Sequence, residues 1–494
     1  MTIVQTTSGA ARGQVHEGVA VHLGIPYAHA SRFRAPVVTA PGDGELDATA
    51  FGPIAPQSGG AQFQRSDLVQ AEDCLSLNVW APATPADTSR PVMVWIHGGA
   101  FVHGSAASPL YDGAALARHG DVVVVTVNYR LGALGFLAHP DLEGDDGAHG
   151  NWGLLDQIEA LRWVRANAAA FGGDPDNITI FGESAGAVSV LLLCASPRTG
   201  GLFHRAVAQS GAALSITPEK AAETAERLAA ALELDRVGDL RDVPVARILH
   251  AQARAGGGGG AGMRTFVPTI DGVVLDRPPL EALATGASAG VPLVVGTNVD
   301  EWKLFAPADP HSRDLDEDGL RRRLERRRLR DVDEVITTFR SARAARDEPT
   351  EPRDVWVAFE SERFFRVPAL AAAEAHAAHQ PATFVYLFGW GSPAMKGWLG
   401  ACHGLEIAYV FGTQGQGELA MFTGAGPDAD ALARSMMDAW VAFARTGDPS
   451  TPANPWPAYE TTTRPTMCFD ATTRLERGPR EPERAAVAAS LKYG

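Results

Sequence analysis

A serine flanked by glycines is the feature of the sequence best suited to covalent chemistry. Ser184 lies in the motif GESAG, which follows the β-branched run NITIF and precedes the apolar stretch AVSVLLLC. A strand, a G-x-S-x-G turn and a helix form a nucleophile elbow, whose sharp turn projects the serine hydroxyl above a sheet. A helix that begins at Ala185 would point its free N–H groups at the negative charge that develops during acyl transfer. G-x-S-x-G alone also arises by chance, but in this context it predicts Ser184 as a nucleophile.

A glycine-rich turn upstream of the serine could bind the resulting oxyanion. The run VMVWI leads into HGGAFVHGS at residues 97–105. Such a turn directly after a central strand frees backbone N–H groups, as in the HGGG-type element of oxyanion holes. The predicted donors are the backbone N–H groups of Gly99, Ala100 and Ala185; the alternative is that HGGAF is only a tight loop. His97 is expected to hydrogen-bond locally and hold the loop rather than to act as a base.

An acidic residue and then a histidine follow the serine along the chain. Catalytic triads built on a nucleophile elbow have this order of serine, acid and histidine. Asp300 and Glu301 come after the apolar run PLVVGTN, and His403 follows the run TFVYLFGW and a glycine-containing loop. Catalytic groups collect at the carboxyl ends of strands in open α/β sheets, which favours this acidic pair. A histidine in a loop after a late strand suits a general base. Position alone leaves Asp300 and Glu301 as alternatives for the acid.

Strands and helices alternate along the chain and would position these groups. Near-continuous apolar runs are typical of strands that are buried on both faces. They occupy residues 91–97, 121–129, 177–182, 205–211, 292–298 and 383–390. Helical patterns occupy residues 151–171, 218–240 and 405–411. The alternation predicts an α/β fold with a central, mostly parallel sheet flanked by helices.

Three further segments have compositions that indicate their place in the fold. The N-terminal residues alternate in polarity and are expected to form an edge strand. The glycine-rich stretch 255–262 is expected to be a flexible loop, and the arginine-rich run 321–330 a solvated helix face rather than an anion site. Because no repeat or interdomain linker interrupts the chain, residues 1–494 are expected to form a single domain. Residues from about 305 to 374 are expected to form a helical cap in it.

The overall composition disfavours some classes of function. The 494 residues have a net charge of −15, and nucleic-acid binding requires positive charge to replace counterions on phosphates. No apolar run is long enough to cross a bilayer, and the first residues lack the basic and apolar regions of a secretory signal. We therefore expect no nucleic-acid or membrane partner. A monomer that binds a small molecule is the default expectation.

The cysteines indicate a reducing environment. The chain has four of them, Cys74, Cys194, Cys402 and Cys468, without the spacing of zinc or redox motifs. So few cysteines in a long chain do not form a disulfide framework, and reduced, buried thiols in a cytoplasmic protein are expected. The acyl-transfer chemistry outlined above requires neither a metal nor a cofactor.

Taken together, these motifs resemble the type-B carboxylesterase family, which includes the cholinesterases and the bacterial para-nitrobenzyl esterases. Matching segments extend over nearly the whole chain and occur in the family's order. They are GIPYA (24–28), RFRAP (32–36), EDCLSLNVWAP (72–82), VWIHGGAF (94–101), NYRLGALGFL (128–137), AFGGDPDNITIFGESAG (170–186), GTNVDEW (296–302), CHGLEIAYVFG (402–412) and AWVAFARTGDP (439–449).

The resemblance implies an α/β-hydrolase fold and a serine carboxylesterase that hydrolyses carboxylic esters of small, largely apolar substrates through an acyl-enzyme. It also selects between the acidic residues, because the second acidic residue of the family's N-x-D-E-G segment orients the histidine. By this match Glu301 joins Ser184 and His403 in the triad. Glu183 and Ser210 would be buried supports of the site. Two structural ion pairs are implied as well, Arg32 with Glu72 and Arg130 with Asp156.

The chain departs from the family pattern at several positions. Ala55 stands near the place of a further cysteine in many relatives, so Cys74 is expected to be free, as in a bacterial, intracellular form. The loop 57–71 lacks the tryptophan with which cholinesterases bind choline, so choline recognition has no support. HGGAF replaces the commoner HGGGF and keeps the backbone donors. Trp302 replaces the glycine of N-x-D-E-G, a bulky change beside Glu301.

Two other functions remain as alternatives. The same triad could serve a carbamate or amide hydrolase that acts on xenobiotics, and only the shape of the pocket would decide. Some relatives on this fold are non-catalytic binding proteins, which typically lack the serine. The presence of Ser184, Glu301 and His403 together favours an enzyme.

Overall fold

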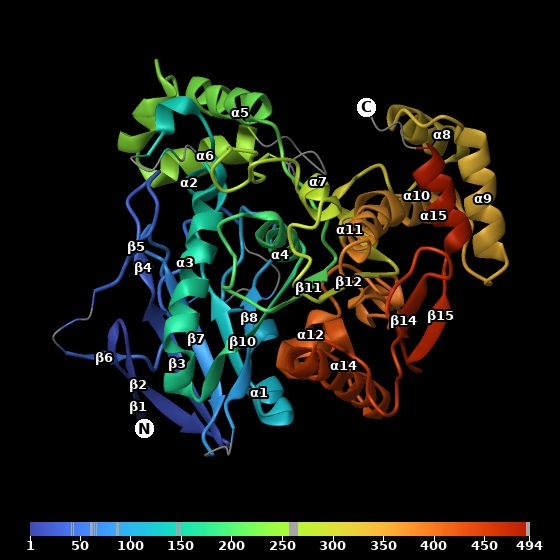
Figure 1. Cartoon of the computed structure of the whole chain (residues 1–494). Coiled ribbons are helices and arrows are strands. Elements are labelled where there is room, and N and C mark those ends of the chain that lie inside the picture. Colours follow the sequence, from blue (N-terminus) through green and yellow to red (C-terminus); the bar gives the residue numbers. More distant parts are fainter. Residues whose placement is uncertain are drawn as a thin grey trace.

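A large sheet runs through the protein (Figure 1). The computed structural model describes residues 1–490 except 41, 43, 60–62, 64, 66, 85–87, 145–146, 148–149 and 256–264, and thirteen strands of these residues belong to that sheet. The strand order is β1-β2-β3-β7-β9-β8-β10-β11-β12-β13-β14-β15, and β6 pairs with β2. Neighbours from β9 to β14 are parallel, whereas the N-terminal strands and β15 add antiparallel pairs. The mostly parallel sheet confirms the prediction.

The predicted apolar runs coincide with the central strands. The parallel part consists of β9 (Val123–Val127), β8 (Arg90–Ile96), β10 (Gly173–Glu183), β11 (Arg205–Gln209), β12 (Leu293–Asn298), β13 (Thr383–Phe388) and β14 (Pro465–Phe469). The other strands are β1 (Thr2–Thr6), β2 (Gly9–His16), β3 (Val19–Pro26), β6 (Glu45–Asp47), β7 (Ser76–Pro82) and β15 (Arg474–Arg477). A separate pair consists of β4 (Ala28–His29) and β5 (Val37–Val38). β1 pairs only with β2, as expected of an edge strand.

Helices cover both faces of the sheet because successive side chains of a strand point to opposite sides. In β8, Val92, Val94 and Ile96 belong to one apolar cluster, and Met93 and Trp95 belong to another. The first cluster includes α2 (Gly132–Phe136), α3 (Trp152–Asn167), α4 (Ala185–Ala195), α5 (Pro218–Ala231), α6 (Val245–Ala255), α7 (Pro279–Ala284) and α11 (Val367–Ala377). The second includes α1 (Ala114–Gly120), α12 (Ile407–Phe411), α13 (Ala420–Thr423) and α14 (Pro427–Thr446).

A third apolar cluster joins helices that follow β12 to the C-terminal helix, and these helices lie together at one side of the molecule (Figure 1). They are α8 (Glu317–Arg326), α9 (Val332–Ala344), α10 (Pro352–Ser361) and α15 (Glu481–Ser490). Leu320 and Leu324 of α8 are fully buried, whereas most arginines of the run 321–330 are exposed. The arginine-rich run is therefore the solvated helix face that the sequence predicts.

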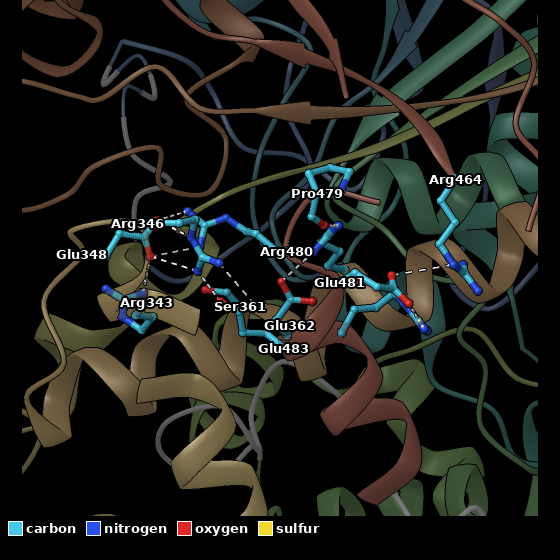
Figure 2. A network of polar contacts seen from close by, with 12 residues as sticks. Arg343, Arg346, Glu348, Ser361, Glu362, Arg464, Pro479, Arg480, Glu481 and Glu483 are labelled. Carbon is cyan, nitrogen blue, oxygen red and sulfur yellow. Dashed lines mark hydrogen bonds and ion pairs between the residues drawn. The ribbon is translucent and has the colours of Figure 1, made fainter. Parts of the chain in front are cut away.

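A network of polar contacts surrounds η8 (Glu362–Arg366), a π-helical turn between α10 and α11 (Figure 2). Arg366 donates to Glu362 over 2.9 Å and also to the backbone carbonyl of Pro479. Nearby, Glu348 accepts charged contacts from three arginines, Arg343, Arg346 and Arg480. Charge-assisted hydrogen bonds of this kind fix geometry well, so the C-terminal segment holds η8 in place.

One predicted helix is divided in the structure. The sequence predicts a helix over residues 218–240, but α5 ends at Ala231 and a 3₁₀ helix, η4 (Val237–Asp242), follows. Glu233 between them has φ 59°, a left-handed conformation that stops an α-helix. The glycine-rich stretch 255–262 lies outside the described residues apart from Ala255, the last residue of α6.

Two smaller expectations, on the cysteines and on the ion pairs, are confirmed. Cys74 and the other three cysteines are buried and free. Both implied ion pairs form, with shortest contacts of 2.6 Å; the pair of Arg130 with Asp156 is almost fully buried, whereas that of Arg32 with Glu72 is partly exposed. Among the helices of the described residues, none has the length and apolar character needed to cross a membrane.

Candidate active site

Ser184 lies at the sharp turn between β10 and α4. Its backbone has φ 57° and ψ −121°, a sparsely populated conformation that persists only where the surroundings enforce it. A Cβ atom at Gly186 would lie 2.0 Å from the carbonyl oxygen of Ile96, and one at Gly182 would lie 2.7 Å from the same oxygen. Because no side chain fits at either glycine, the packing of strand against helix explains the G-x-S-x-G pattern.

A histidine and a glutamate form a buried pair beside this turn. His403 Nδ1 donates to Glu301 Oε2 over 2.6 Å. The other carboxylate oxygen, Oε1, accepts the backbone N–H of Asn298 over 2.8 Å. Glu301 begins the 3₁₀ turn η6 (Glu301–Leu304), directly after β12, and its side chain is 0% exposed. With Nδ1 donating, the neutral histidine has its lone pair at Nε2, which is the arrangement that a general base requires.

The adjacent Asp300 has a different position. Its backbone N–H donates to the carbonyl of Ala401 over 2.9 Å, and its carboxylate accepts the N–H of Ala401 over 3.1 Å. Lys303 Nζ lies 3.0 Å from the same carboxylate. Asp300 therefore holds the loop that precedes His403 rather than the imidazole itself.

The bulky Trp302 is accommodated on the side of the neighbouring helices. Its backbone N–H donates to Ser361 Oγ of α10 over 3.0 Å. Its ring packs against Phe305 and Phe364, with centroid distances of 5.4 and 5.5 Å. The replacement of glycine by tryptophan thus leaves the contact between Glu301 and the histidine intact.

A cavity of about 680 Å³ brings most of the predicted site residues together. Glu301 lies behind His403 and does not line it. No hydrogen bond of the described residues joins Ser184 Oγ to His403, a contact that often tightens only when substrate binds. The predicted residues that line the cavity are Ser184, His403, Gly99, Ala100, Ala185, Glu183 and Ser210.

The loop after β8 has backbone donors available at this cavity. Gly99 has φ 115°, and a Cβ atom there would lie 1.9 Å from the carbonyl oxygen of His103, so the tight loop requires glycine. Ala100 also has a positive φ of 53°. Within the part of the chain that the structure describes, the N–H groups of Gly99, Ala100 and Ala185 donate to no protein acceptor. They are therefore free to bind an oxygen anion of a ligand.

His97 supports this loop from outside the cavity. Its Nδ1 donates to the carbonyl of Gly98 over 2.8 Å, and its ring stacks on Tyr129 with a centroid distance of 4.4 Å. Burial lowers the pKa of His97 to about 4, so its imidazole is neutral at physiological pH. The local hydrogen bond agrees with the expectation from the sequence.

A third buried carboxyl, Glu406, belongs to the site but was not singled out from the sequence. Asn298 Nδ2 donates to it over 2.6 Å, and Gln209 Nε2 donates over 3.2 Å. Gln209 in turn accepts from the indole N–H of Trp440. A glutamate inside the apolar segment LEIAYVFG was the available signal, because ionisable residues are rarely fully buried without a partner.

Burial and neighbouring charges act in opposite directions on the imidazole. Burial alone would lower the pKa of His403, but the nearby carboxylates of Glu183 and Glu301, and the hydrogen bond that His403 donates to Glu301, raise it above its usual value. Glu183 Oε1 lies 3.1 Å from His403 Nε2. Burial raises the pKa of Glu183 and, to about 7, that of Glu406. The pKa of His403 therefore depends on the charges of the buried carboxyl groups around it.

We expect Glu183→Gln to move the acidic limb of the kcat/KM profile to lower pH. The substitution removes a negative charge that raises the pKa of His403, and the base is active only when neutral. Values of kcat/KM between pH 5 and 9 on a neutral ester give the midpoint of the acidic limb. Glu406→Gln should move it in the same direction by less, because Glu406 is the weakest of the raising influences. A limb that stays in place or moves to higher pH in Glu183→Gln would contradict this account.

The rest of the cavity wall is mainly apolar. The rings of Phe305 and Phe365 contact the imidazole of His403, with centroid distances of 5.1 and 4.7 Å. Ser210 has φ 56°, and its buried hydroxyl has no hydrogen-bond partner among the described residues. Within the same described ranges, no cluster of three or more histidine, cysteine, aspartate or glutamate side chains is arranged to hold a metal ion. The aromatic residues of the wall are Phe63, Phe101, Tyr111, Phe305, Phe364, Phe365 and Phe422.

Comparison with known proteins finds carboxylesterases over nearly the whole chain. The model of the carboxylesterase family matches residues 1–487. The para-nitrobenzyl esterase of Bacillus subtilis (strain 168) is 38% identical over 99% of both chains. A phenmedipham hydrolase of Pseudarthrobacter oxydans is 35% identical over 92% of both chains. The crystal structure of a carboxylesterase from Geobacillus stearothermophilus superposes with a TM-score of 0.87 at 41% identity, over 98% of this chain and 100% of that one.

These matches cover the strands, the serine turn and the histidine loop in one continuous alignment range. The solved relatives are carboxylesterases of the α/β-hydrolase fold, and the mostly parallel sheet described above has that architecture. The chain therefore belongs to the carboxylesterase family and is a carboxylic ester hydrolase.

Proposed function

We propose that the protein hydrolyses carboxylic esters of small, largely apolar substrates through an acyl-enzyme on Ser184. The main support is the 2.6 Å contact between His403 Nδ1 and Glu301 Oε2, with His403 and Ser184 in the wall of one apolar cavity. A serine, a histidine and an acid in these roles form a catalytic triad.

In the first stage, His403 Nε2 takes the proton of Ser184 Oγ as this oxygen attacks the ester carbonyl carbon. Glu301 stabilises the imidazolium, and the N–H groups of Gly99, Ala100 and Ala185 bind the oxyanion. The imidazolium then gives its proton to the alcohol oxygen as the C–O bond breaks. In the second stage, His403 deprotonates a water that attacks the acyl-enzyme and releases the acid.

The surrounding residues have supporting roles in this proposal. Glu183 and Ser210 lie in the cavity wall next to the nucleophile and shape the electrostatic environment of His403. Residues from about 305 to 374 form a helical cap within a single domain of residues 1–494. The support for the cap is that η8 and α11, at its C-terminal end, supply Arg363, Phe364, Phe365, Pro368 and Ala371 to the cavity.

We further propose a cytoplasmic, bacterial enzyme that acts as a monomer on small molecules, without a metal or cofactor and without nucleic acid as a partner. The buried, free cysteines are consistent with a reducing compartment. The formal charge of −15 disfavours nucleic acid.

A second candidate is hydrolysis of xenobiotic carbamates or amides, because one relative is a phenmedipham hydrolase. We expect esters to react faster than carbamates or anilides of the same acyl and aryl size. The amine of an anilide is a poorer leaving group, and His403 is the only acid assigned to protonate it. Measuring kcat/KM for matched substrates, including para-nitrophenyl esters of increasing acyl length, tests the order and maps the acyl pocket. Faster anilide or carbamate turnover would replace the ester assignment.

A further inference from the structure

Among the described residues, one arginine lines the cavity, on a largely apolar part of its wall. Arg363, the second residue of η8, lines the cavity together with its neighbours Phe364 and Phe365. Its side chain is 17% exposed, so it is largely removed from solvent. The proposed hydrolysis of an ester needs no guanidinium here, since the nucleophile, the base and the oxyanion donors are all supplied by other residues.

Buried Glu360 fixes the orientation of this guanidinium. Arg363 Nε donates to Glu360 Oε1 over 3.1 Å, and Nη2 donates to Oε2 over 2.6 Å. Two parallel contacts of this kind hold the planar group in a defined plane. Nη1 has no hydrogen-bond or ion-pair partner among the described residues. One edge of the guanidinium therefore keeps its donors available.

The local charge is not balanced. Glu360 is 0% exposed and also binds Arg327, whose Nε lies 2.9 Å from Oε1. One carboxylate thus binds two guanidinium groups, Arg363 in the cavity wall and the partly exposed Arg327 outside it, so Glu360 does not neutralise Arg363 alone. A largely apolar wall screens charge poorly, so the part of the Arg363 charge that Glu360 does not neutralise acts more strongly on a ligand than it would in water.

The backbone that presents Arg363 is itself held firmly. π-Helical turns are rare and occur often at functional sites. Arg366 at the end of η8 binds Glu362 and the carbonyl of Pro479, and these two partners are labelled in Figure 2. The ring of Phe365 packs on His403. The same turn therefore contacts the base and presents the cation, with little freedom to move one without the other.

We propose that Arg363 forms an anion subsite, which selects esters with a second, distal carboxylate on the substrate. The carboxylate would bind the free edge of the guanidinium while the ester carbonyl lies at Ser184. A guanidinium edge matches a carboxylate in shape and charge. This inference rests on the proposed function, because it names the substrate class of the same cavity.

The test compares matched acidic and neutral esters. Monoethyl esters of adipic, suberic and sebacic acid carry the carboxylate on the acyl arm, and acetate esters of ω-hydroxy acids carry it on the alcohol arm. The corresponding ω-amides are neutral controls of nearly equal size. The measured quantity is a ratio of two kcat/KM values at each chain length. It compares the ester that carries the ω-carboxylate with the matched ester that carries the ω-amide. We expect this ratio to exceed unity for at least one length in the wild-type protein.

Variants then assign the preference to Arg363. Arg363→Met should lower the ratio about tenfold, since a hydrogen bond to a charged group contributes on this scale. Arg363→Lys should keep part of the preference. Arg326→Met, which removes an exposed arginine of α8 outside the cavity, controls for the change in total charge and should leave the ratio unchanged. Added salt should reduce the wild-type ratio.

The outcomes separate the subsite from the proposed function. The subsite alone would be overturned by a ratio below unity at every length on both arms, or by an equal ratio in the wild type and Arg363→Met. In either case, hydrolysis of the neutral control esters still tests the proposed function. If the wild-type protein hydrolyses none of these esters, the proposed function fails. Calorimetric binding of suberate to the wild type and to Arg363→Met would then decide the subsite, which is overturned if both bind equally or neither binds.

Discussion

Replacing Ser184 with alanine is expected to lower kcat on a para-nitrophenyl ester by about 10⁶-fold, the loss seen when the nucleophile of a comparable triad is removed. Without the hydroxyl, no acyl-enzyme can form, and the remaining oxyanion donors retain only a small part of the acceleration. Steady-state rates with purified wild-type and variant protein measure the loss. Mass spectrometry after brief exposure to substrate should find an acyl group on wild-type Ser184 and none on the variant.

The neighbouring Ser189 offers a matched control. It lies in α4, is fully buried, and accepts a hydrogen bond from Gln157 over 3.1 Å, outside the cavity. Ser189→Ala likewise removes a serine hydroxyl, but from the helix that follows the turn and away from the cavity, so it should retain hydrolysis at close to the wild-type rate. Circular dichroism of both variants verifies the fold. Equal hydrolysis by Ser184→Ala and the wild type would mean that Ser184 is not the nucleophile.

Local sequence patterns predicted the sheet well because its strands are buried on both faces. β8 illustrates this, since residues 92–96 are all apolar and contribute to clusters on the two sides. The same local reasoning failed for residues 218–240. Alanine, glutamate and leucine all favour helix, so nothing in the composition indicates the left-handed Glu233 that divides the segment.

The candidate site divides along similar lines. Ser184 could be found from a contiguous strand, turn and helix. Glu301 and His403 are 102 residues apart, and their pairing came from chain order and from the family resemblance rather than from any local pattern. Glu406 and Arg363 could not be assigned, because their significance depends on which distant side chains and walls surround them in the folded protein.

Replacing Glu301 with glutamine is expected to lower kcat about 10⁴-fold, as for the corresponding change in a serine protease triad. The structure gives the reason. The backbone N–H of Asn298 donates to Oε1, so the amide oxygen of the glutamine would occupy that position and its NH₂ group would face His403. The imidazole would then accept at Nδ1 and carry its proton at Nε2, where it cannot accept the proton of Ser184.

The adjacent Asp300→Asn variant makes this prediction specific. Asp300 accepts the N–H of Ala401 and contacts Lys303, but it does not touch the imidazole. An asparagine keeps an acceptor oxygen for the N–H, so the loss of activity should be far smaller than in Glu301→Gln. Rates of both variants on one ester, with the histidine tautomer followed by ¹⁵N NMR, distinguish the two acids. If Asp300→Asn caused the larger loss, the acid that orients His403 would have to be reassigned, because two neighbouring carboxylates would then have exchanged the roles that their contacts give them.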